Sequence, residues 1–203
     1  MSRFSQAMLV PLAAAMMVAG CATTPTAEVT RFHLGQPIPK DTLTVIPAAG
    51  IDPNSLEFRS YANDVAQQFA ALGFPAAPVP AKSAYVVTIN ASQSSGVAPP
   101  TSSPVSIGFG GATGGSGFGM GGGVSVPVGG SGAKMVNNNQ VALQMKRRSD
   151  NSIVWEGRAA QQVPSNAANA SLAASVPLLT SLLLKDFPGI SGQTITVKLP
   201  QGK

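Results

Sequence analysis

The stretch that decides the fold is residues 141–159, VALQMKRRSDNSIVWEGRA. Apolar and polar residues alternate along both of its arms, and the polar run Ser-Asp-Asn at 149–151 favours a turn between them. A period of two places alternate side chains on opposite faces of a strand. The stretch therefore predicts a β-hairpin with one buried face, where Trp155 packs under a helix rather than gripping a ligand. The alternating positions are Val141, Leu143, Met145, Ile153, Trp155, Gly157 and Ala159.

A helix is expected upstream of this hairpin. Apolar side chains recur there at spacings of four and three, which makes one stripe on a helix surface. Asp52 or Asn54 can cap its start, Pro53 suits its first turn, and Gly73 ends it. The stripe is expected to face the core, and its members are Phe58, Ala62, Val65, Phe69 and Leu72.

A second helix is expected downstream of the hairpin, beginning near Ser165, whose hydroxyl can cap it. Pro177 lies inside this segment and is expected to kink or split the helix, because proline has no backbone N–H. Pro188 and Gly189 end the segment. Its apolar stripe is Leu172, Val176, Leu179, Leu183 and Phe187.

Shorter apolar, β-branched runs at 29–34, 43–46, 84–91 and 195–199 predict the remaining strands. The order is then strand, strand, helix, strand, a Gly-rich segment, strand, strand, helix and strand. This order predicts an α+β fold, in which a mainly antiparallel sheet carries two helices packed on one face. We expect a single domain over residues 29–200, and the order of its strands stays open.

The first 21 residues have the three-part pattern of an export signal. Arg3 gives a positive start, and residues 7–19 are apolar apart from Pro11. This apolar run of 13 residues is shorter than the roughly 20 residues that a membrane-spanning helix needs. Residues 1–20 are therefore interpreted as a cleaved signal peptide.

The end of this signal resembles the lipobox of bacterial lipoproteins, Val18-Ala19-Gly20-Cys21. The resemblance implies cleavage between Gly20 and Cys21, a diacylglyceryl group on the Cys21 sulfur, and an acyl chain such as palmitate on the new amino end. Ala22, the residue after the cysteine, resembles the residue found at this position in lipoproteins that are sorted to the outer membrane. We expect residues 21–28 to form a lipidated tether, and the protein to be anchored by lipid at the outer membrane, facing the periplasm of the cell envelope.

Residues 97–135 form a Gly-rich insert, in which residues 105–132 hold thirteen glycines. Apolar side chains keep a period of two within it, so it resembles a hairpin with one apolar face. Three interpretations remain: a mobile loop, an ordered extension that packs on a partner or on its own copy, and a hairpin that inserts into a membrane. The candidate interaction residues are Phe109, Phe118, Met120, Val124 and Val126.

The remaining chemistry argues against an enzyme. His33 is the only histidine, no Gly-x-Ser-x-Gly motif accompanies it, and it is interpreted as a strand-end or surface residue. One histidine and one lipidated cysteine cannot build a zinc site, so no metal and no cofactor other than the covalent lipid is expected. The acidic residues are dispersed, and only folding could bring together a pair such as Asp64 and Glu156. No catalytic residues are therefore predicted.

The net charge of +5 comes from scattered residues, and Lys146-Arg147-Arg148 is the one basic cluster. At the end of a hairpin such a cluster is typical of a solvated tip, although an anionic lipid surface is an alternative. No aromatic residues lie beside it, which argues against nucleic acid as a partner.

Several motifs occur together in this chain: Cys21, Leu72-Gly73-Phe74, Tyr85-Val86-Val87-Thr88-Ile89, Ile153-Val154-Trp155-Glu156-Gly157 and Asp186-Phe187-Pro188-Gly189. In these motifs the chain resembles the envelope lipoproteins grouped as domain of unknown function 4136. The resemblance covers roughly residues 29–200, and the Gly-rich insert departs from it in length. It implies an α+β lipoprotein and brings no established activity and no catalytic residues.

Three functions follow as hypotheses. The first is a lipid-anchored, non-catalytic binding or scaffolding module that contacts an unknown envelope protein in the periplasm. The second is an oligomeric accessory subunit of a secretion or pore complex that uses the Gly-rich hairpin. The third, weakly supported, is a hydrolase that relies on His33.

Overall fold

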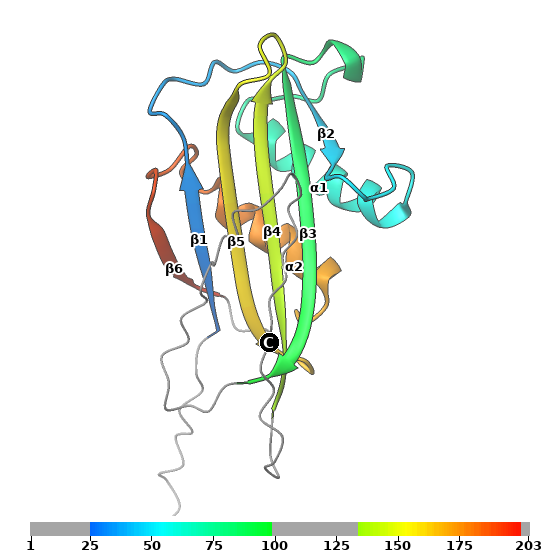
Figure 1. Ribbon diagram of the computed structural model, residues 1–203, viewed down its shortest axis with the longest axis vertical. Helices are drawn as coiled ribbons and strands as arrows, with labels where there is room; N and C mark the ends of the chain where they lie inside the picture. Colours follow the sequence, from blue (N-terminus) through cyan, green and yellow to red (C-terminus); the bar gives the residue numbers. More distant parts are fainter. Residues whose placement is uncertain (1–24, 99–133, 200–203) are drawn as a thin grey trace, which may run out of the picture.

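The computed structural model describes residues 25–98 and 134–199 (Figure 1). The predicted signal peptide, the predicted lipobox with Gly20 and Cys21, and the candidate residues of the Gly-rich insert lie outside these ranges. The described residues form a six-stranded sheet with two α-helices and one short 3-10 helix, Pro80–Lys82. The predicted α+β class is confirmed.

The sheet has the strand order β2-β3-β4-β5-β1-β6. All neighbouring strands are antiparallel except β2 and β3, which are parallel. The central hairpin of β4 and β5 is the predicted one, extended to 13 and 12 residues. The strands are β1 (Thr26–Phe32), β2 (Leu43–Pro47), β3 (Tyr85–Val97), β4 (Met135–Arg147), β5 (Ile153–Pro164) and β6 (Thr194–Lys198).

The first strand of the chain lies inside the sheet, because β1 pairs with both β5 and β6. Thr26 is opposite Lys198, and Val97 at the end of β3 is opposite Met135 at the start of β4. In β5 the last residue, Pro164, is opposite Val136. The start of β1, the end of β3 and the start of β4 therefore share one end of the sheet, as Figure 1 shows.

Helix α1 (Leu56–Ala71) has the predicted stripe, with Phe58, Val65 and Phe69 buried. The predicted caps were wrong. The cap is Ser55, whose hydroxyl oxygen accepts a hydrogen bond from the Phe58 backbone N–H, while the Asp52 carboxylate accepts from the Asn54 N–H in the preceding turn.

Helix α2 (Leu172–Leu184) starts seven residues later than Ser165 and is capped by Ser171. The predicted start was wrong because the Ser165 backbone N–H bonds to the Met135 carbonyl oxygen and continues the strand region. The helix is continuous through Pro177, so the predicted split does not occur.

The two helices lie on one face of the sheet, behind the strands in the view of Figure 1. Apolar side chains of both helices and the inward phase of the strands form one core. Trp155 is fully buried within it, as predicted, and lies beside Phe187 with ring centroids 5.2 Å apart. Thr26–Glu28, which fall within the predicted tether, instead belong to β1, where they pair with β5 and β6.

Candidate functional site: the open face of the sheet

The face of the sheet opposite the helices carries the polar phase of the strands. Residues that alternate with the buried ones line up across neighbouring strands in register, so they form two rows. The first row is Asn90, Ala142, Arg158 and Thr30. The second row is Thr88, Gln144, Glu156 and Phe32.

These rows form the floor of a groove of about 790 Å³. Ala48, Ala49 and Ile51, from the loop that follows β2, also line it. The first of these residues is fixed to the sheet because its backbone N–H donates to the Ile89 carbonyl oxygen over 2.9 Å. The groove thus crosses β3, β4, β5 and β1 and falls within the size range of small-molecule sites, roughly 300–1,000 Å³.

The polar floor is partly organised by its own contacts. The Gln144 amide donates to a carboxylate oxygen of Glu156 over 3.3 Å, which links β4 to β5. At the far side the hydroxyls of Thr30 and Thr194 share a hydrogen bond of 2.7 Å. Phe32 is opposite Glu156 in register, and its side chain is 49% exposed. One exposed aromatic ring therefore closes a row of hydrogen-bonding side chains.

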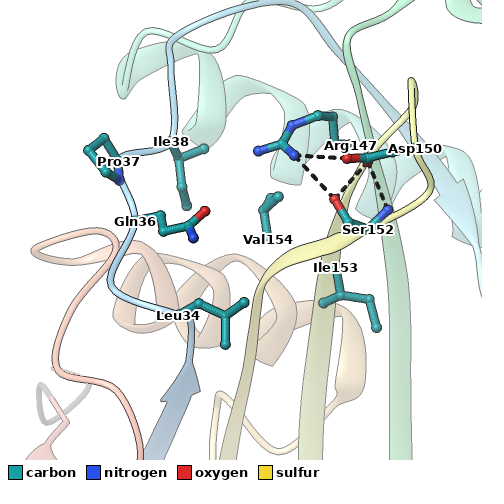
Figure 2. Close-up of a pocket in the computed structure, with 9 residues that line it drawn as sticks. All are labelled: Leu34, Gln36, Pro37, Ile38, Arg147, Asp150, Ser152, Ile153 and Val154. Atoms are coloured by element: carbon teal, nitrogen blue, oxygen red, sulfur yellow. Dashed lines mark hydrogen bonds and ion pairs between the residues drawn. The ribbon is translucent and has the colours of Figure 1, made fainter.

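A second, smaller pocket of about 180 Å³ lies at the start of β5, beside the turn that joins it to β4 (Figure 2). Figure 2 shows Leu34 and Ile38 of the loop after β1 facing Val154, while Arg147 points toward Asp150 and Ser152. The polar groups of this pocket are engaged with one another. The Ser152 hydroxyl and backbone N–H, followed by Arg147, hold the pKa of Asp150 down to about 2. This cluster therefore fixes the β4–β5 turn.

Comparison with known proteins identifies the family. The family model described as "Domain of unknown function (DUF4136)" matches residues 39–189. The chain belongs to this family. The match covers the central and late motifs that carry the family resemblance and confirms that resemblance.

An uncharacterized protein of Zymomonas mobilis subsp. mobilis is 30% identical over 212 residues, covering 84% of this chain and 80% of that protein. Among solved structures, the PelC dodecamer from Paraburkholderia phytofirmans is similar with a TM-score of 0.41 and 12% identity, covering 77% of this chain and 94% of that one. A PDZ domain protein from Parabacteroides distasonis has a TM-score of 0.46 and 10% identity, covering 85% and 39% respectively.

The basic cluster of the DUF4136 domain is not a free patch. Arg148 donates to the carbonyl oxygens of Ser83 and Pro80 over 2.8 and 3.0 Å, and Arg147 pairs with Asp150 at 3.0 Å. Arg148 is exposed and Arg147 partly exposed, which agrees with the predicted solvated tip, although folding also brings the carbonyls beside 3-10 helix Pro80–Lys82 against the turn.

His33 lies just beyond β1, where its ring is held by backbone groups. Its Nε2 is 3.0 Å from the Gly189 carbonyl oxygen, and its Nδ1 accepts from the Gly35 N–H. This placement agrees with the predicted strand-end role. Asp64 and Glu156 are not brought together, because one lies on α1 and the other on the opposite face of the sheet.

Within residues 25–98 and 134–199, no group of three or more His, Cys, Asp or Glu side chains has metal-binding geometry. In the same ranges, no helix of the DUF4136 domain combines the length and apolarity required to cross a membrane.

Of the open-face residues, only Glu156 was considered from the sequence, as one member of a possible acidic pair. The signal was present in the hairpin itself, because Gln144, Glu156 and Arg158 occupy the polar phase of the alternation that predicted its buried face. Their convergence with Thr88 and Phe32 needed the strand order, which periodicity alone does not give.

Proposed function

We propose that the protein is a lipid-anchored lipoprotein of the outer membrane, whose folded domain is a non-catalytic binding module in the periplasm. The observation that carries the binding role is the groove of about 790 Å³ on the open face of the sheet. The lipobox ending at Cys21 supports the anchor.

The division of the sheet into two faces supports a binding role. One face is packed against α1 and α2, so its residues stabilise the fold. The other face keeps amide, hydroxyl and charged side chains within a concave surface that the core does not need. Polar groups that converge in a concave site are typical of ligand recognition.

The cysteine content of the chain allows a test that does not depend on the ligand. Cys21 is the only cysteine, and a lipid on its sulfur would leave an introduced cysteine as the sole free thiol. Thr88→Cys places this thiol on the groove floor. Thr44→Cys is a matched control, because Thr44 in β2 lies opposite Val86 and does not line the groove.

A polar maleimide would be applied to isolated envelopes and to the purified lipidated protein. If the groove is occupied in the envelope, labelling of Thr88→Cys should be several-fold slower there than in the purified protein, while Thr44→Cys should be unchanged. Equal rates for Thr88→Cys in the two samples would refute the binding role of this face.

A further inference from the structure

The floor of the groove offers a ligand side chains rather than backbone groups. Strands β3, β4, β5 and β1 each have a neighbour on both sides, so their N–H and C=O groups are used in the sheet. Peptides that bind sheets usually add a strand at an open edge. This groove lies over the centre of the sheet, and its position therefore does not favour recognition of an extended peptide.

The charge of the lining also restricts the ligand. Glu156 and Arg158 contribute one negative and one positive group, and the other lining side chains are neutral. The groove therefore has no net formal charge with which to select an anion or a cation. A hydrocarbon ligand would also be disfavoured, because it would cover the amides of Asn90 and Gln144 without giving them hydrogen bonds.

The hydrogen-bonding groups of the floor match a ligand rich in hydroxyls. Gln144 uses one N–H for Glu156, which leaves its other N–H as a donor, and its carbonyl and the Glu156 carboxylate as acceptors. Thr88 and Thr30 add hydroxyls that both donate and accept. Sugar hydroxyls have the same dual capacity, so adjacent ones can satisfy a row of such side chains.

Phe32 supplies the aromatic part of the site. Its half-exposed ring is opposite Glu156, at the end of the row that contains Gln144. A sugar ring has an apolar C–H face that packs on an aromatic ring while its hydroxyls reach neighbouring polar groups. We propose that the groove binds a saccharide, a short run of neutral sugar rings lying across β4, β5 and β1. This inference rests on the proposed binding function and names its ligand class.

Calorimetry on the mature lipidated protein tests the inference. The protein would be kept in lauryldimethylamine oxide, since this detergent has no sugar headgroup. The probes are cellotetraose, maltotetraose and the tetramer of β-1,4-linked N-acetylglucosamine, with tetraalanine as the peptide comparison. Saturable binding of at least one tetrasaccharide is expected, without binding of tetraalanine.

The variants locate the binding. Gln144→Ala and Phe32→Ala should each weaken the affinity by about tenfold, the loss expected for one good contact. Gln162→Ala is the matched control, because Gln162 lies on the same face of β5 but bonds to Asn138 outside the groove. Its affinity should stay within about twofold. Unchanged melting temperatures would show that all three variants are folded.

Two results would overturn the inference: binding of none of the three sugars, or sugar binding that Gln144→Ala and Phe32→Ala leave unchanged. If Thr88→Cys is nevertheless protected in envelopes, the groove binds a ligand of another class and only the saccharide is excluded. If Thr88→Cys is unprotected as well, the binding function of this face fails with it.

Discussion

The indole nitrogen of Trp155 donates a 2.9 Å hydrogen bond to the carbonyl oxygen of Pro188. This contact joins the Trp-x-Gly segment of β5 to the Phe-Pro-Gly segment after α2, 33 residues later in the chain. Two of the segments that carry the family resemblance are thus joined by a hydrogen bond. A ligand-binding role for Trp155 is not needed to explain its presence.

Gly157 provides the space for that indole. A Cβ atom at this position would lie 2.6 Å from Trp155 Cη2 and 2.9 Å from Leu183 Cδ2. Because both neighbours are packed in the core, Gly157→Ala should lower the free energy of unfolding by about 1–3 kcal/mol, the usual cost of overpacking. Urea denaturation followed by circular dichroism would measure it.

The same substitution in a Trp155→Phe background provides its control. Phenylalanine lacks the outer indole ring, including the atoms nearest the added methyl group, so Gly157→Ala should cost less there. A double-mutant cycle would report this coupling. An identical cost in the two backgrounds would contradict the steric explanation.

Asn139 anchors the chain segment that leads into α2. Its amide donates to the Ala170 carbonyl oxygen at 3.1 Å and to the Ser175 hydroxyl at 2.5 Å, and its side chain is fully buried. Asn139→Ala would leave these acceptors without that donor, so a loss of about 1–3 kcal/mol is expected. Asn138→Ala, one residue away on the open face, should change the stability little. Equal losses for both variants in thermal unfolding would argue against the anchoring role.

Arg31, in β1, caps the C-terminal end of α2. Its guanidinium donates to the carbonyl oxygens of Leu183, Leu182 and Lys185 over 2.8, 2.6 and 3.2 Å. Lysine cannot reproduce this planar fork. Arg31→Lys should therefore cost about 1.5–3 kcal/mol and speed amide exchange after the helix, for example at Phe187. Arg59→Lys, on the exposed side of α1, is the control.

The Asp150 turn predicts a dependence on acid. The pKa of Asp150 is lowered from 3.8 to about 2, with the Ser152 hydroxyl as the largest cause. Since the folded chain favours the ionised form, this stabilisation is present above about pH 4 and is lost as the pH falls toward 2. An NMR titration of the carboxyl carbon should find the low midpoint, and Ser152→Ala should raise it more than Arg147→Gln. An unshifted midpoint in the wild type would contradict these contacts.

The proposed anchor predicts a change in fractionation. Cys21→Ser removes the thiol that accepts the diacylglyceryl group, so the protein should leave the membrane fraction, and globomycin should cause the wild-type precursor to accumulate. Mass spectrometry of the mature protein should find two lipid modifications on residue 21. A mature chain that begins beyond Cys21 would exclude the anchor.

Periodicity predicted most of this fold because the hairpin and the helix stripes face a single core. The predicted caps failed for a local reason. Several polar residues precede each helix, and which one caps depends on where the preceding turn places the backbone: Ser55 rather than Asp52, and Ser171 rather than Ser165. Sequence spacing does not contain that information.

The groove could not be predicted, because its rows depend on pairing between distant segments. Phe32 becomes a neighbour of Glu156 only when β1 enters the sheet between β5 and β6. The contacts of the basic cluster have the same origin, since Arg148 donates to the carbonyl oxygen of Ser83, which lies 65 residues earlier in the sequence. Both are products of topology rather than of local pattern.

The first strand begins at Thr26, only five residues after Cys21. An extended chain spans at most about 3.6 Å per residue, so a lipid on Cys21 would keep Thr26 within roughly 18 Å of the bilayer surface. Val97 and Met135, the first and last residues of the Gly-rich insert, share that end of the sheet. Strand β4 runs for 13 residues, which is 12 steps of about 3.4 Å, so the turn at Asp150 lies about 40 Å from that end of the sheet. The proposed attachment would therefore give the molecule a lipid-proximal base and a distal tip, with the insert rooted at the base.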